Sequence, residues 1–205
     1  MPTVFKNIKP YYSKNKGNIS LFKGNSLEIL KEFKSESFDM IFADPPYFLS
    51  NDGITCQGGK MVKVNKGKWD VGMSPSEIHE FNKAWLEECK RILKPNATIF
   101  VSGTSHNIYS VGFCLQELGY KIINDISWFK VNPPPNLSCR YFTHSTETIL
   151  WAKKDKKADS AVTVTIFNMY SPLRARKMNE NGYLDPFIPF EFFGDPSIRK
   201  QLFMI

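Results

Sequence analysis

Four consecutive residues, Asp44-Pro45-Pro46-Tyr47, combine groups that can hold and polarise a planar ring with an amino substituent. Two successive prolines fix two φ angles and lack a backbone N–H, so their carbonyls are rigidly directed acceptors. Asp44 adds a carboxylate acceptor, and Tyr47 adds an aromatic face for stacking. Two acceptors beside a stacking ring match the exocyclic amino group of a planar base. Out of context, an ordinary Asp-Pro turn is the alternative interpretation.

A buried strand is expected to carry these residues. The preceding segment, FDMIFA at 38–43, is a nearly continuous apolar run, which is typical of a strand covered on both faces in a parallel sheet. Ligands of such sheets lie beyond the carboxyl ends of the strands, where Asp44 follows. Further strands are expected at 19–22, 97–102 and 147–152, and residues 120–130 are expected to form a strand pair or one long bent strand.

Three helices are expected between the strands. The first spans about 26–33 with Ser26 as its N-cap, and the third spans about 107–118 and is ended by Gly119. The second begins with a capping box formed by Ser74 and Glu77 around a proline at the first helical position. The alternation of strands and helices predicts a doubly wound α/β sheet.

The charge of the chain favours an anionic partner. Its 205 residues, enough for one domain, contain 27 Lys and Arg against 20 Asp and Glu, a net charge of +7. Nucleic acid is one interpretation, and an enzyme that happens to be basic is the other. Within the glycine-rich segment 48–73, a basic run precedes Trp69 and predicts phosphate contacts; a solvated loop is the alternative. The run consists of Lys60, Lys63, Lys66 and Lys68.

Several other classes are disfavoured. The four cysteines are far apart, which fits neither a zinc ribbon nor a redox pair, and no metal site is expected. No apolar run approaches the ~20 residues that a membrane-spanning helix needs, and the N-terminus has no signal-peptide pattern. The sequence therefore predicts a cytoplasmic protein without a membrane partner.

With the flanking residues included, IFADPPY resembles the catalytic motif of amino-group DNA methyltransferases. Residues 128–142 (WFKVNPPPNLSCRYF) and 143–152 (THSTETILWA) resemble the second half of the catalytic region in the β-group adenine-N6 methyltransferases of restriction–modification systems. The resemblance covers roughly residues 8–154. It implies a Rossmann-like sheet dependent on S-adenosylmethionine, and site-specific methylation of adenine N6 in double-stranded DNA.

The resemblance also implies roles for individual residues. The Asp44 carboxylate and the Pro45 carbonyl would accept hydrogen bonds from the adenine amino group, while the flipped base stacks on Tyr47. The residues implied at the catalytic centre are Asp44, Pro45, Pro46 and Tyr47. Those implied at the cofactor are Asn25, Asp44 and Pro46, and those implied at DNA, besides the four lysines, are Asn132 and Arg140.

One family feature is missing from the sequence. The family pairs a strand with a D-P-F-x-G-S-G-T motif at its cofactor site, but this chain contains no G-x-G. Residues 184–187 (LDPF) echo the first half of the motif, and IPFE at 188–191 then replaces the glycines. The catalytic region is therefore expected at 1–157, and a divergent tail of unknown role is expected at 158–205. The catalytic residues are expected to be intact and the cofactor site to be damaged.

The missing motif would leave the sheet incomplete. A bare edge beside 38–43 is expected, which would favour a homodimer unless residues 161–170 (AVTVTIFNMY) cover it. The alternative functions are a non-catalytic nucleic-acid-binding remnant, and the same motif acting on cytosine N4, RNA or a protein amide. Asp at position 44 favours adenine, because cytosine-N4 enzymes more often have Ser there.

Overall fold

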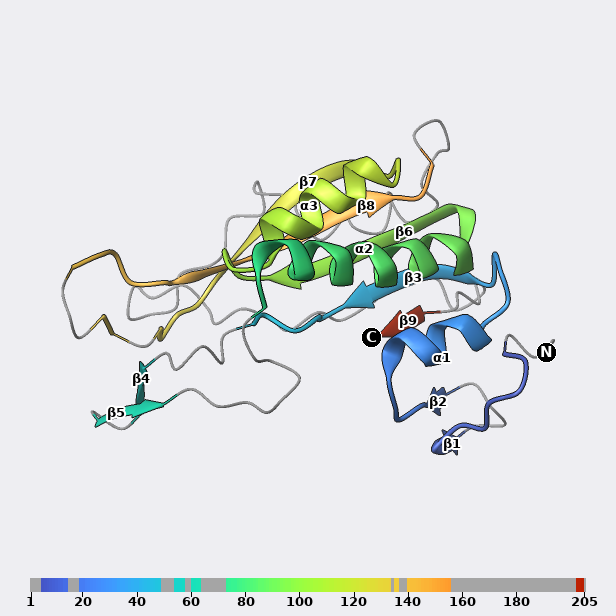
Figure 1. The fold of residues 1–205 in the computed structure, drawn as a ribbon, viewed down its shortest axis with the longest axis horizontal. Helices are drawn as coiled ribbons and strands as arrows, with labels where there is room; N and C mark the ends of the chain where they lie inside the picture. Colours follow the sequence, from blue (N-terminus) through green and yellow to red (C-terminus); the bar gives the residue numbers. More distant parts are fainter. Residues whose placement is uncertain are drawn as a thin grey trace, which may run out of the picture.

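A mixed sheet of five strands, in the order β7-β8-β6-β3-β9, forms the centre of the computed structural model (Figure 1). The structure describes residues 5–14, 19–48, 54–57, 60–63, 73–133, 135–136, 140–155 and 202–204. The sheet contains β3 (Phe38–Ala43), β6 (Leu93–Gly103), β7 (Lys121–Phe129), β8 (Thr146–Lys153) and β9 (Leu202–Met204). Strand β3 is parallel to both of its neighbours, β6 and β9, as expected for an apolar strand buried inside a sheet.

The predicted α/β sheet is not parallel throughout, and the difference lies at the β7 edge. Strand β8 runs antiparallel to both β6 and β7. The described residues between β7 and β8 form no helix, and two consecutive strands without a helical crossover pair antiparallel. The α/β class is confirmed, with an antiparallel pair added at this edge.

Three helices are described: α1 (Ser26–Glu32), α2 (Pro75–Ile92) and α3 (Ile108–Glu117). The predicted capping box of α2 is present, because the Glu77 N–H donates to Ser74 Oγ at 3.3 Å and the Ser74 N–H donates to Glu77 Oε2 at 2.8 Å. Helix α3 lies within the predicted range and is followed by Gly119 with a φ of 78°. Glycine adopts this left-handed conformation without strain, so it ends the helix.

The predicted N-cap of α1 is displaced by one residue. Asn25 is the cap, since its side-chain oxygen accepts the Leu27 N–H at 3.0 Å, and Ser26 is the first helical residue. Asn and Ser cap helices about equally well, so the sequence alone does not distinguish two adjacent candidates.

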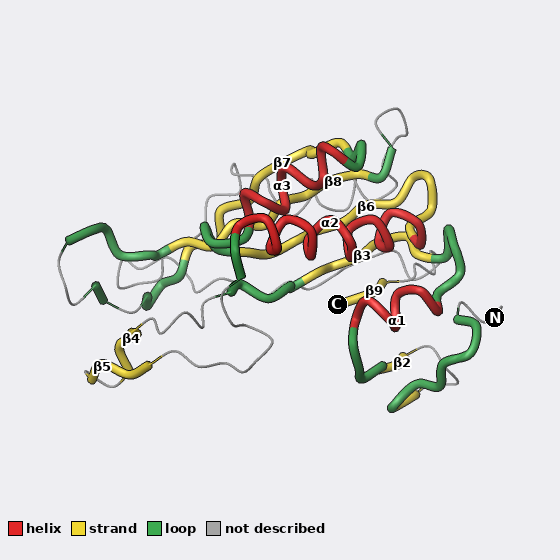
Figure 2. Tube along the Cα trace, in the orientation of Figure 1, coloured by secondary structure: helices red, strands yellow, loops and turns green. Residues whose placement is uncertain are grey.

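The described helices all border one face of the sheet. Figure 2 shows α2 and α3 side by side across the strands. Beneath them Ile41, Ile99 and Val101 are fully buried, in the same core cluster as Leu30 of α1. The opposite face carries a second buried cluster of Met40, Phe100, Ile149 and Trp151, and no described helix packs on it. Burial on both faces explains why the predicted strands read as continuous apolar runs.

The edge of β3 differs from the expectation in two respects. The predicted strand at 19–22 stays outside the main sheet: β2 (Ile19–Leu21) pairs with β1 (Tyr12–Lys14) in a separate two-stranded antiparallel sheet. Strand β9 instead pairs with β3, in a register that places Met40 opposite Leu202. The edge expected to be bare is therefore paired, and residues 161–170 lie outside the described residues.

Candidate active site

The residues after β3 meet the residues that end β6, because parallel strands bring their carboxyl ends to one edge of the sheet. Ser102, near the end of β6 and 3% exposed, donates its hydroxyl to Asp44 Oδ1 at 2.6 Å. The Tyr47 hydroxyl donates to the same oxygen at 2.7 Å. Within the described part of the chain, Asp44 Oδ2 accepts no hydrogen bond. The carboxylate is thus anchored through one oxygen and offers the other.

Tyr47 is half-buried, and this burial is the main reason that its phenol pKa lies above the ordinary value of a tyrosine. The negative charges of Asp44 and Glu147 raise the pKa further, whereas a hydrogen bond with Ser102 lowers it. The phenol therefore stays protonated at neutral pH. A protonated phenol can donate to Asp44, so Tyr47 braces the carboxylate as well as presenting a ring.

The second proline of the loop, Pro46, is held by the residue that begins α3. The Pro46 carbonyl accepts a hydrogen bond from Asn107 Nδ2 at 2.9 Å, and Asn107 is the N-cap residue of α3. Pro45 is buried, and no described residue donates to its carbonyl. Two acceptors of the loop, the Pro45 carbonyl and Asp44 Oδ2, thus accept no hydrogen bond from the described residues.

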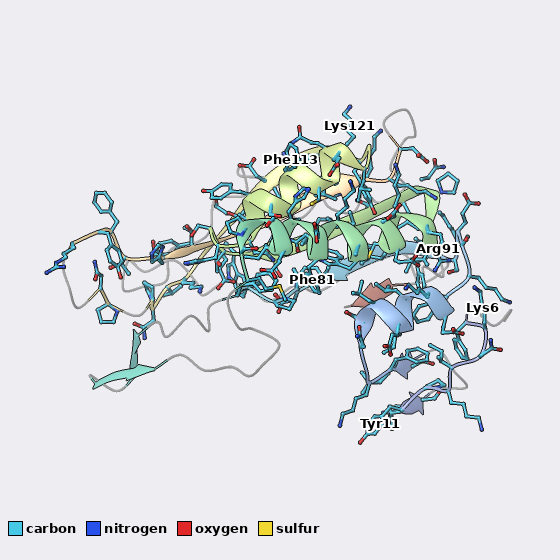
Figure 3. The ribbon with its side chains drawn as sticks, in the orientation of Figure 1. Lys6, Tyr11, Phe81, Arg91, Phe113 and Lys121 are labelled. Atoms are coloured by element: carbon cyan, nitrogen blue, oxygen red, sulfur yellow. The ribbon has the colours of Figure 1, made fainter. Side chains whose placement is uncertain are left out.

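Phe48 fixes the far end of the loop. Its ring is 2% exposed and packs edge-on against Phe81 of α2, with ring centroids 5.8 Å apart; Figure 3 labels Phe81 on that helix. Its φ is 55°, an uncommon value for a bulky residue, which the surrounding packing must hold in place. The loop from Asp44 to Phe48 is therefore anchored at both ends.

The remaining predicted site residues make no described contact with this loop. Asn25 is exposed at the N-terminus of α1, and Asn132 and Arg140 are exposed in the segment that joins β7 to β8. Lys60 and Lys63 begin and end β5 (Lys60–Lys63), which pairs with β4 (Ile54–Gln57). Lys66 and Lys68 lie outside the described residues. Figure 1 shows that β4–β5 and the β7–β8 segment extend from the end of the molecule that carries the loop.

Two residues of this site, Ser102 and Asn107, were not expected from the sequence. Ser102 is the last residue of the predicted buried strand 97–102, and Asn107 follows shortly after that strand. The rule that directs attention to carboxyl ends of strands applies to this strand as well as to 38–43, and it would have found both side chains.

One cluster of potential metal ligands exists among the described residues. Donor atoms of His79, Cys114 and Glu117 lie within 4.8 Å of one another. The Lys83 ammonium already contacts Glu117 at 2.6 Å, and burial raises the pKa of the Cys114 thiol, which keeps it neutral. Because Glu117 is neutralised by Lys83 and the thiol is uncharged, we assign no metal to this cluster.

The fold is that of a DNA methyltransferase. The solved structure of PvuII DNA methyltransferase (cytosine-N4-specific) matches with a TM-score of 0.60 at 20% sequence identity, over 82% of this chain and 59% of that chain. None of the described helices is long and apolar enough to cross a membrane.

The sequence matches the DNA methylase family over residues 38–189, so the chain belongs to this family. It is 60% identical over 151 residues to the type II methyltransferase M2.DpnII of Streptococcus pneumoniae, covering 73% of this chain and 56% of that protein. It is 49% identical over 150 residues to the type II methyltransferase M2.MboI of Moraxella bovis, covering 73% of this chain and 55% of that protein. The chain thus spans about half the length of these curated relatives.

Proposed function

We propose that this chain is a site-specific adenine-N6 DNA methyltransferase of a restriction–modification system, with S-adenosylmethionine as cofactor and double-stranded DNA as substrate. The observation that carries the proposal is the geometry of Asp44. One carboxylate oxygen is anchored by Ser102 and Tyr47, and no described residue donates a hydrogen bond to the other oxygen or to the Pro45 carbonyl. The names of the relatives, type II methyltransferases, support the same reaction class.

The open acceptors fit an aromatic amino group. The lone pair of adenine N6 is delocalised into the ring, which makes this nitrogen a weak nucleophile. Hydrogen bonds from its two N–H groups to Asp44 Oδ2 and the Pro45 carbonyl would favour a pyramidal nitrogen and stabilise the positive charge that develops there. Because the loop is anchored before the substrate arrives, little reorganisation is required during the reaction.

Tyr47 would supply the stacking surface for a base flipped out of the duplex. Chemistry on N6 requires this extrusion, and stacking on an aromatic ring contributes ~1–3 kcal/mol per base. The Tyr47 hydroxyl donates to Asp44, so one side chain would both support the base and hold the carboxylate.

The polar groups at the proposed cofactor position are compatible with S-adenosylmethionine, which supplies a methyl group on a sulfonium. Asn25 Oδ1 accepts the Leu27 N–H and retains a second lone pair, and its amide nitrogen donates to no described residue. It can therefore bind a ribose hydroxyl or an adenine nitrogen. Asp44 and Pro46 complete the proposed set, with the Pro46 carbonyl already accepting one hydrogen bond.

The proposed DNA contacts are Lys60, Lys63, Lys66, Lys68, Asn132 and Arg140. Of the described ones, Lys60 and Lys63 lie in β5, and Asn132 and Arg140 lie in the segment that joins β7 to β8. A net charge of +7 is consistent with a phosphate-binding surface. A homodimer stays a prediction, and it loses its original support because β3 is paired on both sides. Because the proposed substrate is DNA, the cytoplasm is the proposed location.

The test is transfer of the methyl group from labelled S-adenosylmethionine to duplex DNA. The DNA is then digested and analysed by mass spectrometry, with the Asp44→Ala variant as control. N6-methyladenine formed by the wild type alone is the expected result. N4-methylcytosine would redirect the proposal to cytosine.

The absence of a G-x-G motif favours a second candidate, a protein that binds DNA without transferring a methyl group. Duplex binding by the wild type, with neither S-adenosylmethionine binding in calorimetry nor any methylated base in the digest, would select this candidate and overturn the first.

A further inference from the structure

A chain of buried hydrogen bonds connects the core of α2 to the proposed catalytic loop. The Trp85 indole N–H donates to Asn82 Oδ1 at 3.1 Å, and Asn82 Nδ2 donates to Asn107 Oδ1 at 2.6 Å. Asn107 Nδ2 then donates to the Pro46 carbonyl at 2.9 Å. Asn82 is 0% exposed and Asn107 is 1% exposed, so water does not compete for these bonds. We call Trp85, Asn82 and Asn107 the amide relay.

The two ends of the amide relay fix the orientation of both side-chain amides. An indole N–H can only donate, so Asn82 must present its oxygen to Trp85. A carbonyl can only accept, so Asn107 must present its nitrogen to Pro46. These two orientations leave Asn82 Nδ2 facing Asn107 Oδ1, so a donor meets an acceptor between the two amides. The second Asn82 N–H is also used, because Ser110 Oγ lies 3.1 Å from Nδ2.

Such an arrangement is more than a means of filling the core. Two buried amides cost free energy unless they are fully hydrogen-bonded, and an apolar pair of similar volume would pack without that requirement. What an apolar pair cannot do is donate to the Pro46 carbonyl. The ring of Pro46 fixes its φ, so only the ψ of Pro46 remains free between the two carbonyls. Holding the Pro46 carbonyl therefore limits the directions that the Pro45 carbonyl can take.

We propose that Asn82 and Asn107 are positioning residues that set the direction of the Pro45 carbonyl and the seat of Tyr47 beside Asp44. They touch neither substrate nor cofactor and act through Pro46. The catalytic consequence rests on the proposed function, whereas the effect on loop geometry does not. The two are therefore measured separately.

The first measurement reports loop geometry without requiring activity. The protein is labelled with 3-fluorotyrosine, and the fluorine resonance of Tyr47 is assigned by its loss in Tyr47→Phe. Asn107→Leu removes the donor to Pro46, and Asn107→Asp replaces it with an acceptor at nearly constant volume. We expect both variants to move the Tyr47 resonance towards that of exposed tyrosines.

The second measurement separates turnover from binding. A misplacement of about 1 Å at reacting groups can cost about 100-fold in rate, so we expect kcat of the Asn107 variants to fall by about 10- to 100-fold. The KM for S-adenosylmethionine should change less than kcat, because the relay contacts only Pro46 of the proposed cofactor set and leaves Asn25 in place. A loss of fold alone would instead lower the amount of active enzyme and leave the KM and the Tyr47 resonance of the remainder unchanged.

The chain offers two matched controls. Thr98 lies in a second buried hydrogen-bond chain, where the Trp151 indole donates to its hydroxyl at 2.5 Å and the hydroxyl donates to the Ala152 carbonyl at 2.7 Å. Thr98→Val should lower the melting temperature without moving the Tyr47 resonance. Ser110→Ala removes a side branch of the amide relay and should leave the resonance in place.

Each outcome decides the proposal. An unmoved Tyr47 resonance in Asn107→Leu and Asn107→Asp, or an equal movement in Thr98→Val, overturns it. If neither Asn107 variant folds, Trp85→Phe decides, because it removes the donor that orients Asn82 and keeps an aromatic ring in the core. An unmoved Tyr47 resonance in that variant also overturns the proposal. If wild-type protein transfers no methyl group, the proposed function fails, but the resonance still decides the positioning role.

Discussion

The loop after β3 and the turn before α1 both carry side chains proposed to bind the target base or the cofactor. The residues that hold these side chains lie at very different distances along the sequence. Asp44 and Pro46 are held by Ser102 and Asn107, which lie 58 and 61 residues away in the sequence. Asn25 is held by a hydrogen bond from a backbone N–H only two residues away. The proposed base-binding side is therefore set by the tertiary fold, and the proposed cofactor side is set mainly by a local helix cap.

This comparison predicts the largest effect for Asp44→Ala. The substitution removes the carboxylate that Ser102 and Tyr47 hold, together with its open oxygen. Loss of one preorganised group at a reaction centre costs about 100- to 1,000-fold in rate. We expect methyl transfer to fall by at least about 100-fold in a filter assay with labelled cofactor, while affinity for duplex DNA in a gel-shift assay stays within about three-fold. Substantial remaining transfer would contradict the role of Asp44.

At Tyr47, the ring should matter more than the hydroxyl. Tyr47→Ala removes a stacking surface worth ~1–3 kcal/mol, which corresponds to a loss of about 5- to 150-fold in kcat/KM. Tyr47→Phe keeps the ring and removes one hydrogen bond to Asp44, worth about 1 kcal/mol and about five-fold. Steady-state kinetics of the two variants compare these effects. Equal losses would show that the brace on Asp44 is the main role of this side chain.

The stability of α1 and of the turn before it should depend most on Arg91, which holds the end of this helix against α2. The Arg91 guanidinium donates to the Leu30 and Phe33 carbonyls at the end of α1, both at 2.9 Å; Figure 3 labels Arg91 at this end of α2. Arg91→Met should lower the free energy of unfolding by about 2 kcal/mol in urea denaturation, because these bonds involve a charged donor.

Lys83→Met is the matched control for Arg91→Met. Lys83 forms an exposed ion pair with Glu117, and such pairs contribute ~0.2–1 kcal/mol. If the two substitutions cost the same free energy, the docking role of Arg91 is wrong.

The smallest effect is expected at Asn25. Asn25→Ala removes the helix cap and should lower the free energy of unfolding by about 1 kcal/mol, whereas Asn25→Asp should retain it. If Asn25 also binds the cofactor, Asn25→Ala weakens the affinity for S-adenosylmethionine in calorimetry and Asn25→Asp does not. Equal affinities in all three proteins would reduce Asn25 to a cap.

The features predicted correctly from the sequence are those encoded by neighbouring residues. The capping box of Ser74 and Glu77 is contained in four residues, and the stop at Gly119 depends on one backbone conformation. The strand at 38–43 and its Asp44 follow from an uninterrupted apolar run. Local chemistry and hydrophobic pattern determine each of these features, so one sequence suffices to find them.

The features that were missed depend on partners far along the chain. No local pattern shows that β9 pairs with β3, that β2 leaves the main sheet, or that β8 runs antiparallel. Polar residues such as Asn82 in an apolar helix face look like ordinary surface positions until their partners are known. The family resemblance identified the loop residues, but the side chains that hold the loop became visible only in three dimensions.

The pairing of β3 has a consequence for the order in which the chain folds during synthesis. Its partner β6 is complete about 60 residues after β3, whereas Leu202, opposite Met40, is made some 160 residues later. Closing a loop of that length costs roughly 4–5 kcal/mol of chain entropy. Until then one edge of an apolar strand is open to the strands of other nascent chains. The strand that carries the proposed catalytic residues is thus the place where we expect this protein to need protection by chaperones while it is being made.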